Sequence, residues 1–217
     1  MLRQYLRRSF HNISKPISAG AGGGGAPTFL IDEDFEETGT PTTGTWATSG
    51  APDFDSTSHS VLTGQAADCV AGSFAVDYTA TDVYIKFEYQ AGGISSERYL
   101  FYLRQGPGLA GGLGLAIKQT AAEKLRIFIN AGVGTASTTF TIQTATKYYI
   151  WADYKISGAC YVGISTADVK PTSGTDTATA WADSGTDSVG ATMGTINCVD
   201  STGVSWFDNL QIAETEF

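Results

Sequence analysis

The sequence predicts an all-β domain in which two antiparallel sheets pack face to face as a sandwich. Of its 217 residues, 12% are aromatic, 26 are glycine and only 16% are charged, a composition that favours strands and turns over surface helices. Segments of alternating apolar and polar residues recur roughly every 10 to 15 residues through most of the chain, as expected of strands. The segments between them are rich in Gly, Asn, Asp and Ser, so they suit hairpin turns and leave no room for crossover helices.

The clearest predicted strand begins at Asp82. Val83, Ile85, Phe87 and Tyr89 form one face of it, and mostly polar residues separate them, which is the pattern of a half-buried strand. The same alternation predicts further strands over Arg98–Arg104, Leu113–Lys118, Lys124–Asn130, Ser137–Ile142, Lys147–Lys155, Ala159–Ile164 and Val204–Ile212.

Charge separates the first 28 residues from the rest of the chain. The formal net charge is −9, but residues 1–28 carry four of the 13 bases and no acid, so 9 bases and 22 acids give residues 29–217 a net charge of −13. Such a surface repels phosphate groups, which argues against nucleic-acid binding. The longest uncharged stretch, 127–146, is interrupted by Asn130, glycines and threonines, so no segment supplies the roughly 20 apolar residues of a membrane span.

Residues 1–28 are predicted to form an extended N-terminal arm, and residues 29–217 the sandwich domain. The arm begins with a basic amphipathic segment and continues into a glycine-rich hinge at 20–25. Its candidate docking residues combine apolar side chains with arginines: Leu2, Arg3, Tyr5, Leu6, Arg7, Arg8 and Phe10. At about 3.3 Å per residue the arm could reach on the order of 90 Å, across a neighbouring subunit. An organellar transit peptide and a tail without a role are the alternatives.

Three cysteines, Cys69, Cys160 and Cys198, are an odd number without CxxC spacing or a nearby histidine. This arrangement indicates neither a disulfide framework nor a zinc site, so buried thiols are expected. A bridge between Cys160 and Cys198 is the alternative if their strands are neighbours.

Aromatic residues occur on strand faces that would otherwise be polar. Tyr149 and Trp151 alternate with inward residues of the strand Lys147–Lys155, and Trp181 interrupts the polar segment 172–195, which is predicted to be a loop over one sheet. Outward aromatic rings can stack on the apolar face of a sugar, or they can form an interface between copies of the chain. Burial in a thicker sandwich is the third interpretation.

No nucleophile motif accompanies the two histidines, His11 and His59. Neither has a companion serine or cysteine in a context such as GxSxG, so a Ser-His-Asp site is not expected. The glycine-rich stretch Gly106–Gly114 lacks the Lys-Ser/Thr pair of a phosphate-binding loop and is expected to be a hairpin loop. The residues therefore predict a protein that is not an enzyme.

Five segments, in this order and spacing, resemble the concanavalin A-like, laminin-G-type jelly rolls that recur in bacteriophage virion proteins. They are FLIDEDFEETGTPTTGTW (Phe29–Trp46), SHSVLTG (Ser58–Gly64), KYYIWADYK (Lys147–Lys155), YVGISTADVKP (Tyr161–Pro171) and WFDNLQIAE (Trp206–Glu214). The resemblance covers residues 29–217. It implies a jelly roll whose first and last strands pair and close the sandwich.

The resemblance suggests two special interpretations of the acidic run Asp32–Glu37, besides the plain one of a solvated edge. Jelly-roll carbohydrate-binding modules often join their first and last strands with a structural Ca²⁺, for which Asp34 or Glu36 with Asp208 would supply oxygen ligands. Endoglucanases with this fold carry two catalytic carboxylates in an ExDxE run. The run here lies on the opening strand and lacks the context of that motif, so no catalytic residue is implied.

Together these inferences predict a non-enzymatic virion structural protein, first of all a capsid decoration (cement) protein on the outer surface of the virion. Its arm would dock on the major capsid protein or other virion proteins, and its jelly roll would project outward. Closed symmetry suggests a homo-oligomer, for which we expect a trimer.

The alternative function is a glycan-binding adhesion module of a head or tail fibre. It would bind a host surface glycan through Tyr149, Trp151 or Trp181. A third interpretation is an organellar or secreted lectin-like protein whose arm is a targeting peptide.

Overall fold

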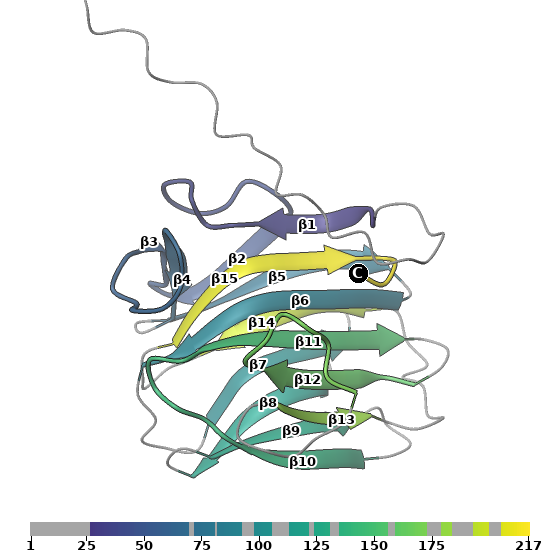
Figure 1. Cartoon of the computed structure of the whole chain (residues 1–217). Helices are drawn as coiled ribbons and strands as arrows, with labels where there is room; N and C mark the ends of the chain where they lie inside the picture. Colours follow the sequence, from purple (N-terminus) through teal and green to yellow (C-terminus); the bar gives the residue numbers. More distant parts are fainter. Residues whose placement is uncertain are drawn as a thin grey trace, which may run out of the picture.

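Two antiparallel sheets face each other in the computed structural model of this chain (Figure 1). The structure describes residues 27–69, 72–80, 82–92, 98–105, 113–121, 124–130, 135–155, 159–172, 179–183, 193–199 and 205–217. Within these ranges the regular elements are all strands, and no helix is long and apolar enough to cross a membrane. The prediction of an all-β, two-sheet antiparallel sandwich is confirmed, whereas arm residues 1–26 lie outside the described part.

The two sheets take their strands from all along the chain. Sheet A contains β1 (Phe29–Glu33), β3 (Asp53–Ser56), β4 (Ala66–Asp68), β6 (Asp82–Ala91), β11 (Lys147–Lys155), β12 (Tyr161–Ser165), β13 (Thr179–Asp183) and β15 (Ser205–Ala213). Its order is β13-β12-β11-β6-β15-β4-β3, and β1 also pairs with β15. Sheet B contains β2 (Thr45–Gly50), β5 (Gly72–Ala80), β7 (Arg98–Gln105), β8 (Leu113–Ala121), β9 (Lys124–Asn130), β10 (Thr135–Thr141) and β14 (Met193–Val199). Its order is β10-β9-β8-β7-β14-β5-β2.

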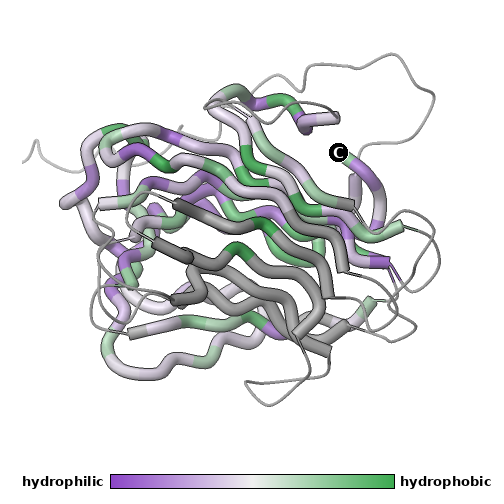
Figure 2. Tube along the Cα trace, turned by 90° about the horizontal axis from the view of Figure 1, so that it is seen from below, coloured by the Kyte–Doolittle hydropathy of each residue, from purple (hydrophilic) through white to green (hydrophobic). Residues whose placement is uncertain are grey.

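The core lies between the sheets, because apolar and polar positions alternate along the described strands (Figure 2). The inward residues of β6 are buried as predicted: Val83, Ile85, Phe87 and Tyr89. Phe207 of β15 lies among three other rings, with centroid distances of 5.7 Å to Phe74, 5.8 Å to Phe87 and 5.4 Å to Tyr89. Since Phe74 belongs to sheet B, this aromatic cluster holds the two sheets together.

The first and last described strands pair, as the resemblance implied. In the β1–β15 pair, Asp32 lies opposite Gln211 and Glu33 opposite Leu210. The register between β15 and β6 shifts between Asp208 and Gln211, where Asn209 has a φ of 49°. A bulge with a left-handed residue bends a strand and redirects its side chains, and asparagine tolerates this backbone conformation.

The prediction of a loop over 172–195 was wrong in part. Strand β13 lies inside this segment and pairs with β12, and β14 begins at Met193. Along β13, Ala180 and Ala182 are buried while Trp181 between them is half-buried. An alternation of five residues whose inward positions are only alanines carries too weak a hydrophobic signal to stand out in a polar segment. For the same reason strands β2 and β4 were not predicted. Strand β5 was not predicted either, although its buried Phe74 and Val76 alternate in the sequence.

Cys69 and Cys160 are buried, as expected. The Sγ of Cys160 donates to the Lys155 carbonyl oxygen at 3.6 Å and accepts from the Lys155 N–H at 3.4 Å, so this thiol joins the two ends of the β11–β12 connection. The side chain of Cys198 lies outside the described part of the chain, and its thiol state stays a prediction.

Candidate binding face

The three aromatic residues predicted to bind glycan or to form an interface all lie on the outer face of sheet A. In the strand register, Trp181 pairs with Gly163 and Gly163 pairs with Trp151, so the two tryptophans share one row across β13, β12 and β11. Tyr149 lies in the neighbouring row, opposite Glu88 of β6. We call the outward side of β6, β11, β12 and β13 the binding face. The sequence placed Tyr149 and Trp151 on one side of a strand, but only the strand order brings Trp181 beside them.

Lysine side chains lie over the aromatic rings of the binding face. The Nζ of Lys86 is 4.8 Å from the Trp151 ring centroid, and that of Lys147 is 5.2 Å from the Tyr149 centroid. Lys170, which follows β12, lies 4.9 Å from the Tyr161 centroid. Such cation–π contacts hold the rings and the charged groups in one layer. Of these residues, Lys86 was detectable in the sequence as an outward residue of β6, whereas nothing local marked Lys170.

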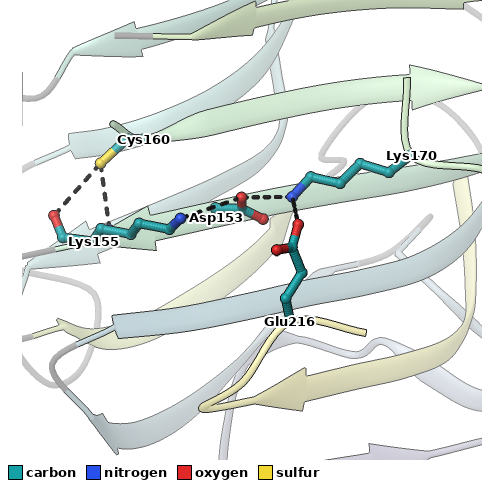
Figure 3. Close-up of polar contacts among 5 residues, drawn as sticks. All are labelled: Asp153, Lys155, Cys160, Lys170 and Glu216. Carbon is teal, nitrogen blue, oxygen red and sulfur yellow. Dashed lines mark hydrogen bonds and ion pairs between the residues drawn. The ribbon is translucent and has the colours of Figure 1, made fainter. Parts of the chain in front are cut away.

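Each of these lysines also contacts a carboxylate. Lys86 is 2.5 Å from Asp168, and Lys147 is 3.1 Å from Glu88. The Lys170 Nζ donates to Asp153 Oδ2 at 2.6 Å and to Glu216 Oε1 at 2.7 Å (Figure 3). The binding face therefore carries lysine–carboxylate pairs between its aromatic rings and has no patch of a single charge among these residues.

Lys170 forms ion pairs with two carboxylates, Asp153 and Glu216. Burial alone would lower the pKa of Lys170, but hydrogen bonds to Asp153 and Glu216 raise it above its ordinary value. The hydrogen bond from Lys170 in turn lowers the pKa of Glu216. Lys170 is consequently charged at neutral pH and connects three segments: strand β11, the connection 166–172 and the tail 214–217.

The tail covers part of the binding face. Trp151 is only 8% exposed, because the ring of Phe217 packs edge-on against it with centroids 5.9 Å apart. Phe217 also stacks on Phe29 of β1 at 6.0 Å. The Nε1 of Trp151 is buried and has no hydrogen-bond partner within the described residues. Sequence analysis missed Phe217, for which no local pattern existed.

Trp181 and Tyr149 are more accessible than Trp151. Both are half-buried, and the Trp181 ring stacks on Tyr161 with centroids 6.3 Å apart. The Tyr161 hydroxyl donates to the Pro171 carbonyl oxygen at 2.5 Å. The same hydroxyl lies over Gly163, and a Cβ atom added to Gly163 would be only 2.1 Å from it. Gly163 is therefore needed so that Tyr161 can lie flat over the strand and support Trp181.

Of the predicted calcium ligands, Asp208 lies in the bulge of β15, whereas Asp34 Oδ1 accepts from the Glu36 N–H at 3.2 Å and Glu36 Oε1 accepts from the Gln65 N–H at 3.0 Å. Asp208 is 1% exposed, and its two carboxylate oxygens accept from the backbone N–H and the side-chain amide of Asn209, at 2.7 and 3.1 Å. Burial, with added repulsion from Glu88, Glu36 and Asp34, raises the pKa of Asp208 to about 7. Within the described ranges no group of three or more His, Cys, Asp or Glu residues could hold a metal ion, so calcium stays a prediction.

Solved structures with a similar fold include binding domains of botulinum neurotoxin. The binding domain of botulinum neurotoxin DC in complex with rat synaptotagmin II is similar with a TM-score of 0.55 at 8% identity, covering 87% of this chain and 48% of that chain. The botulinum neurotoxin serotype D/C binding domain has a TM-score of 0.54 at 10% identity, covering 87% and 49%. The Ca²⁺-bound exoplasmic/lumenal domain of VIP36 has a TM-score of 0.49 at 12% identity, covering 87% and 90%. No protein-family model and no curated protein matches the sequence.

These likenesses concern the fold, since all the identities are low. The chain spans about half the length of the toxin binding domains, 48% and 49%. Together with the strand order, the likeness to the toxin binding domains shows a two-sheet antiparallel jelly-roll fold. The bacteriophage affiliation is a separate prediction, because one fold serves many functions.

Proposed function

We propose that this chain is a non-catalytic binding module that binds a glycan on the outer face of sheet A. The observation that carries the proposal is the binding face itself, where Tyr149, Trp151 and Trp181 lie in two adjacent rows. Aromatic rings stack on the apolar C–H face of a sugar ring. The neighbouring lysines and carboxylates offer hydrogen bonds to sugar hydroxyl groups, a combination typical of small-ligand sites.

The similar solved structures support a binding function over catalysis, because two of them are binding domains of botulinum neurotoxin. The contact made by His59, the one histidine among the described residues, also favours binding over catalysis. Its Nε2 lies 3.0 Å from the Gly64 carbonyl oxygen, so this nitrogen is engaged with backbone rather than with a serine or cysteine nucleophile.

A glycan array probed with the full chain tests the proposal. We expect binding to at least one glycan, with loss in Tyr149→Ala and in Trp181→Ala because each change removes a stacking ring. Trp181→Phe keeps a ring and is the matched control, expected to retain part of the binding. Thr139→Ala, an exposed change on β10 of the other sheet, should have no effect. Binding that survives both alanine changes would place the ligand elsewhere and contradict the proposal.

The virion location, the homotrimer and the docking arm remain predictions from the sequence. The docking arm consists of residues 1–28, of which 1–26 lie outside the described part of the chain, and the virion location comes from the resemblance of residues 29–217 to phage jelly rolls. Deletion of residues 2–20 should abolish incorporation into particles and leave the unfolding temperature unchanged. Unchanged occupancy would refute docking through the arm.

A further inference from the structure

The tail that follows β15, residues 214–217, lies on the binding face through two side chains. Glu216 accepts from Lys170 at 2.7 Å, and the Phe217 ring packs against Trp151 and Phe29. The connection 166–172 lies on the same face, since Asp168 contacts Lys86 and Lys170 contacts Asp153. Of these two segments, only the tail places a ring against Trp151 among the described residues.

Phe217 is held less firmly than the residues around it. Its side chain is 38% exposed, and the Glu216 side chain that anchors the tail is 60% exposed. Exposed ion pairs are screened by water and salt and contribute little stability. Segments with few buried contacts open locally at a much lower free energy than the whole domain unfolds. The tail is therefore the part of the binding face that can be displaced without disturbing the sheet.

Trp151, the ring that Phe217 contacts, has a hydrogen-bond donor without a partner among the described residues. Its Nε1 is buried and lacks an acceptor within the described residues, and a buried donor without a partner is unfavourable. The phenyl ring of Phe217 carries no oxygen or nitrogen atom, so it offers Nε1 at most a weak N–H···π contact. A ligand that presents both an apolar face and an oxygen atom would satisfy Trp151 better than Phe217 does.

We propose that Phe217 occupies the ring-binding position of Trp151 in cis, and that a neutral pyranose binds there by displacing the tail. The inference rests on the proposed glycan-binding function and names its ligand class. A neutral sugar is favoured because the lysines of the face already have carboxylate partners: Lys86 with Asp168, Lys147 with Glu88, Lys155 and Lys170 with Asp153. A pyranose ring supplies the apolar face for stacking and hydroxyl oxygens that accept from Nε1.

The test compares the wild type with Phe217→Ala in the full chain. Acrylamide quenching of tryptophan fluorescence reports access to Trp151, and Trp151→Phe in the Phe217→Ala background identifies the part of the signal that belongs to Trp151. Titration with methyl hexopyranosides, followed by saturation-transfer NMR, reports binding. Val169→Ala is the control, because Val169 is 66% exposed in the connection 166–172 and its removal leaves the tail attached.

We expect Phe217→Ala to increase quenching and to raise sugar affinity about 2- to 12-fold, the factor that corresponds to one aromatic pair. Unchanged quenching would overturn the inference, because Trp151 would then not be covered by Phe217. Increased quenching with unchanged sugar affinity would also overturn the inference. In that case the proposed glycan-binding function would still stand, provided that Tyr149→Ala abolishes sugar binding. If no variant and no wild-type protein binds any glycan, the proposed function fails and the inference falls with it.

Discussion

Replacement of Asp208 by asparagine should stabilise the domain at neutral and higher pH but not in acid. Asp208 is almost completely buried in the β15 bulge, and its pKa is raised from 3.8 to about 7 by burial and by Glu88, Glu36 and Asp34. A carboxyl group with a raised pKa holds its proton more tightly in the folded than in the unfolded state. Its contribution to stability is therefore full below pH 3.8 and is lost as the pH rises to about 7.

The size of this loss follows from the pKa difference. A difference of about 3 units, at about 1.36 kcal/mol each, corresponds to at most about 4 kcal/mol between pH 4 and pH 8. Asparagine carries no proton to lose, and its single side-chain oxygen can accept from the Asn209 N–H, as Asp208 does at 2.7 Å, while the 3.1 Å bond from the Asn209 side-chain amide is lost. The variant should thus keep at pH 8 most of the stability that the wild type has only in acid.

Urea unfolding of both proteins from pH 4 to pH 8 measures this effect. The free energy of unfolding of Asp208→Asn minus that of the wild type should grow steadily with pH and level off above about pH 7. Glu37→Gln removes an exposed negative charge from the same region and should give a nearly constant difference. A constant difference for Asp208→Asn as well would show that Asp208 has an ordinary pKa and refute the reasoning.

Three further predictions concern calcium, the core and the face. Calcium at about 100 times its dissociation constant should stabilise the wild type by about 2.7 kcal/mol and Asp208→Asn by clearly less, and equal shifts in melting temperature would exclude Asp208 as a ligand. Phe207→Ala should cost about 3–5 kcal/mol in urea unfolding, since three rings contact Phe207, and a cost near that of a surface change would contradict this. Gly163→Ala should cost about 1–3 kcal/mol by displacing Tyr161, and much less in a Tyr161→Leu background; equal costs in both backgrounds would show that the clash is not with Tyr161.

Strand β6 could be predicted from its large inward residues, and strand β13, with small ones, could not; β5 was missed although it carries Phe74 and Val76. Val83, Ile85 and Phe87 mark β6 clearly, because a half-buried strand repeats every two residues. Ala180 and Ala182 mark β13 only faintly, and its assignment depends on pairing with β12. Burial of a small residue stabilises a strand only when a neighbouring strand is present, and that neighbour is distant in the sequence.

The candidate site divides in the same way. Alternation along one strand is a local property, so an antiparallel sandwich, with Tyr149 and Trp151 on one side of their strand, could be predicted from the residues alone. The row that joins Trp151 to Trp181, and the cover that Phe217 forms over Trp151, join residues 30 and 66 positions apart. These contacts become visible only in the folded domain, because strand order and the path of residues 214–217 are set by the packing of the whole sheet and leave no periodic signal in the chain.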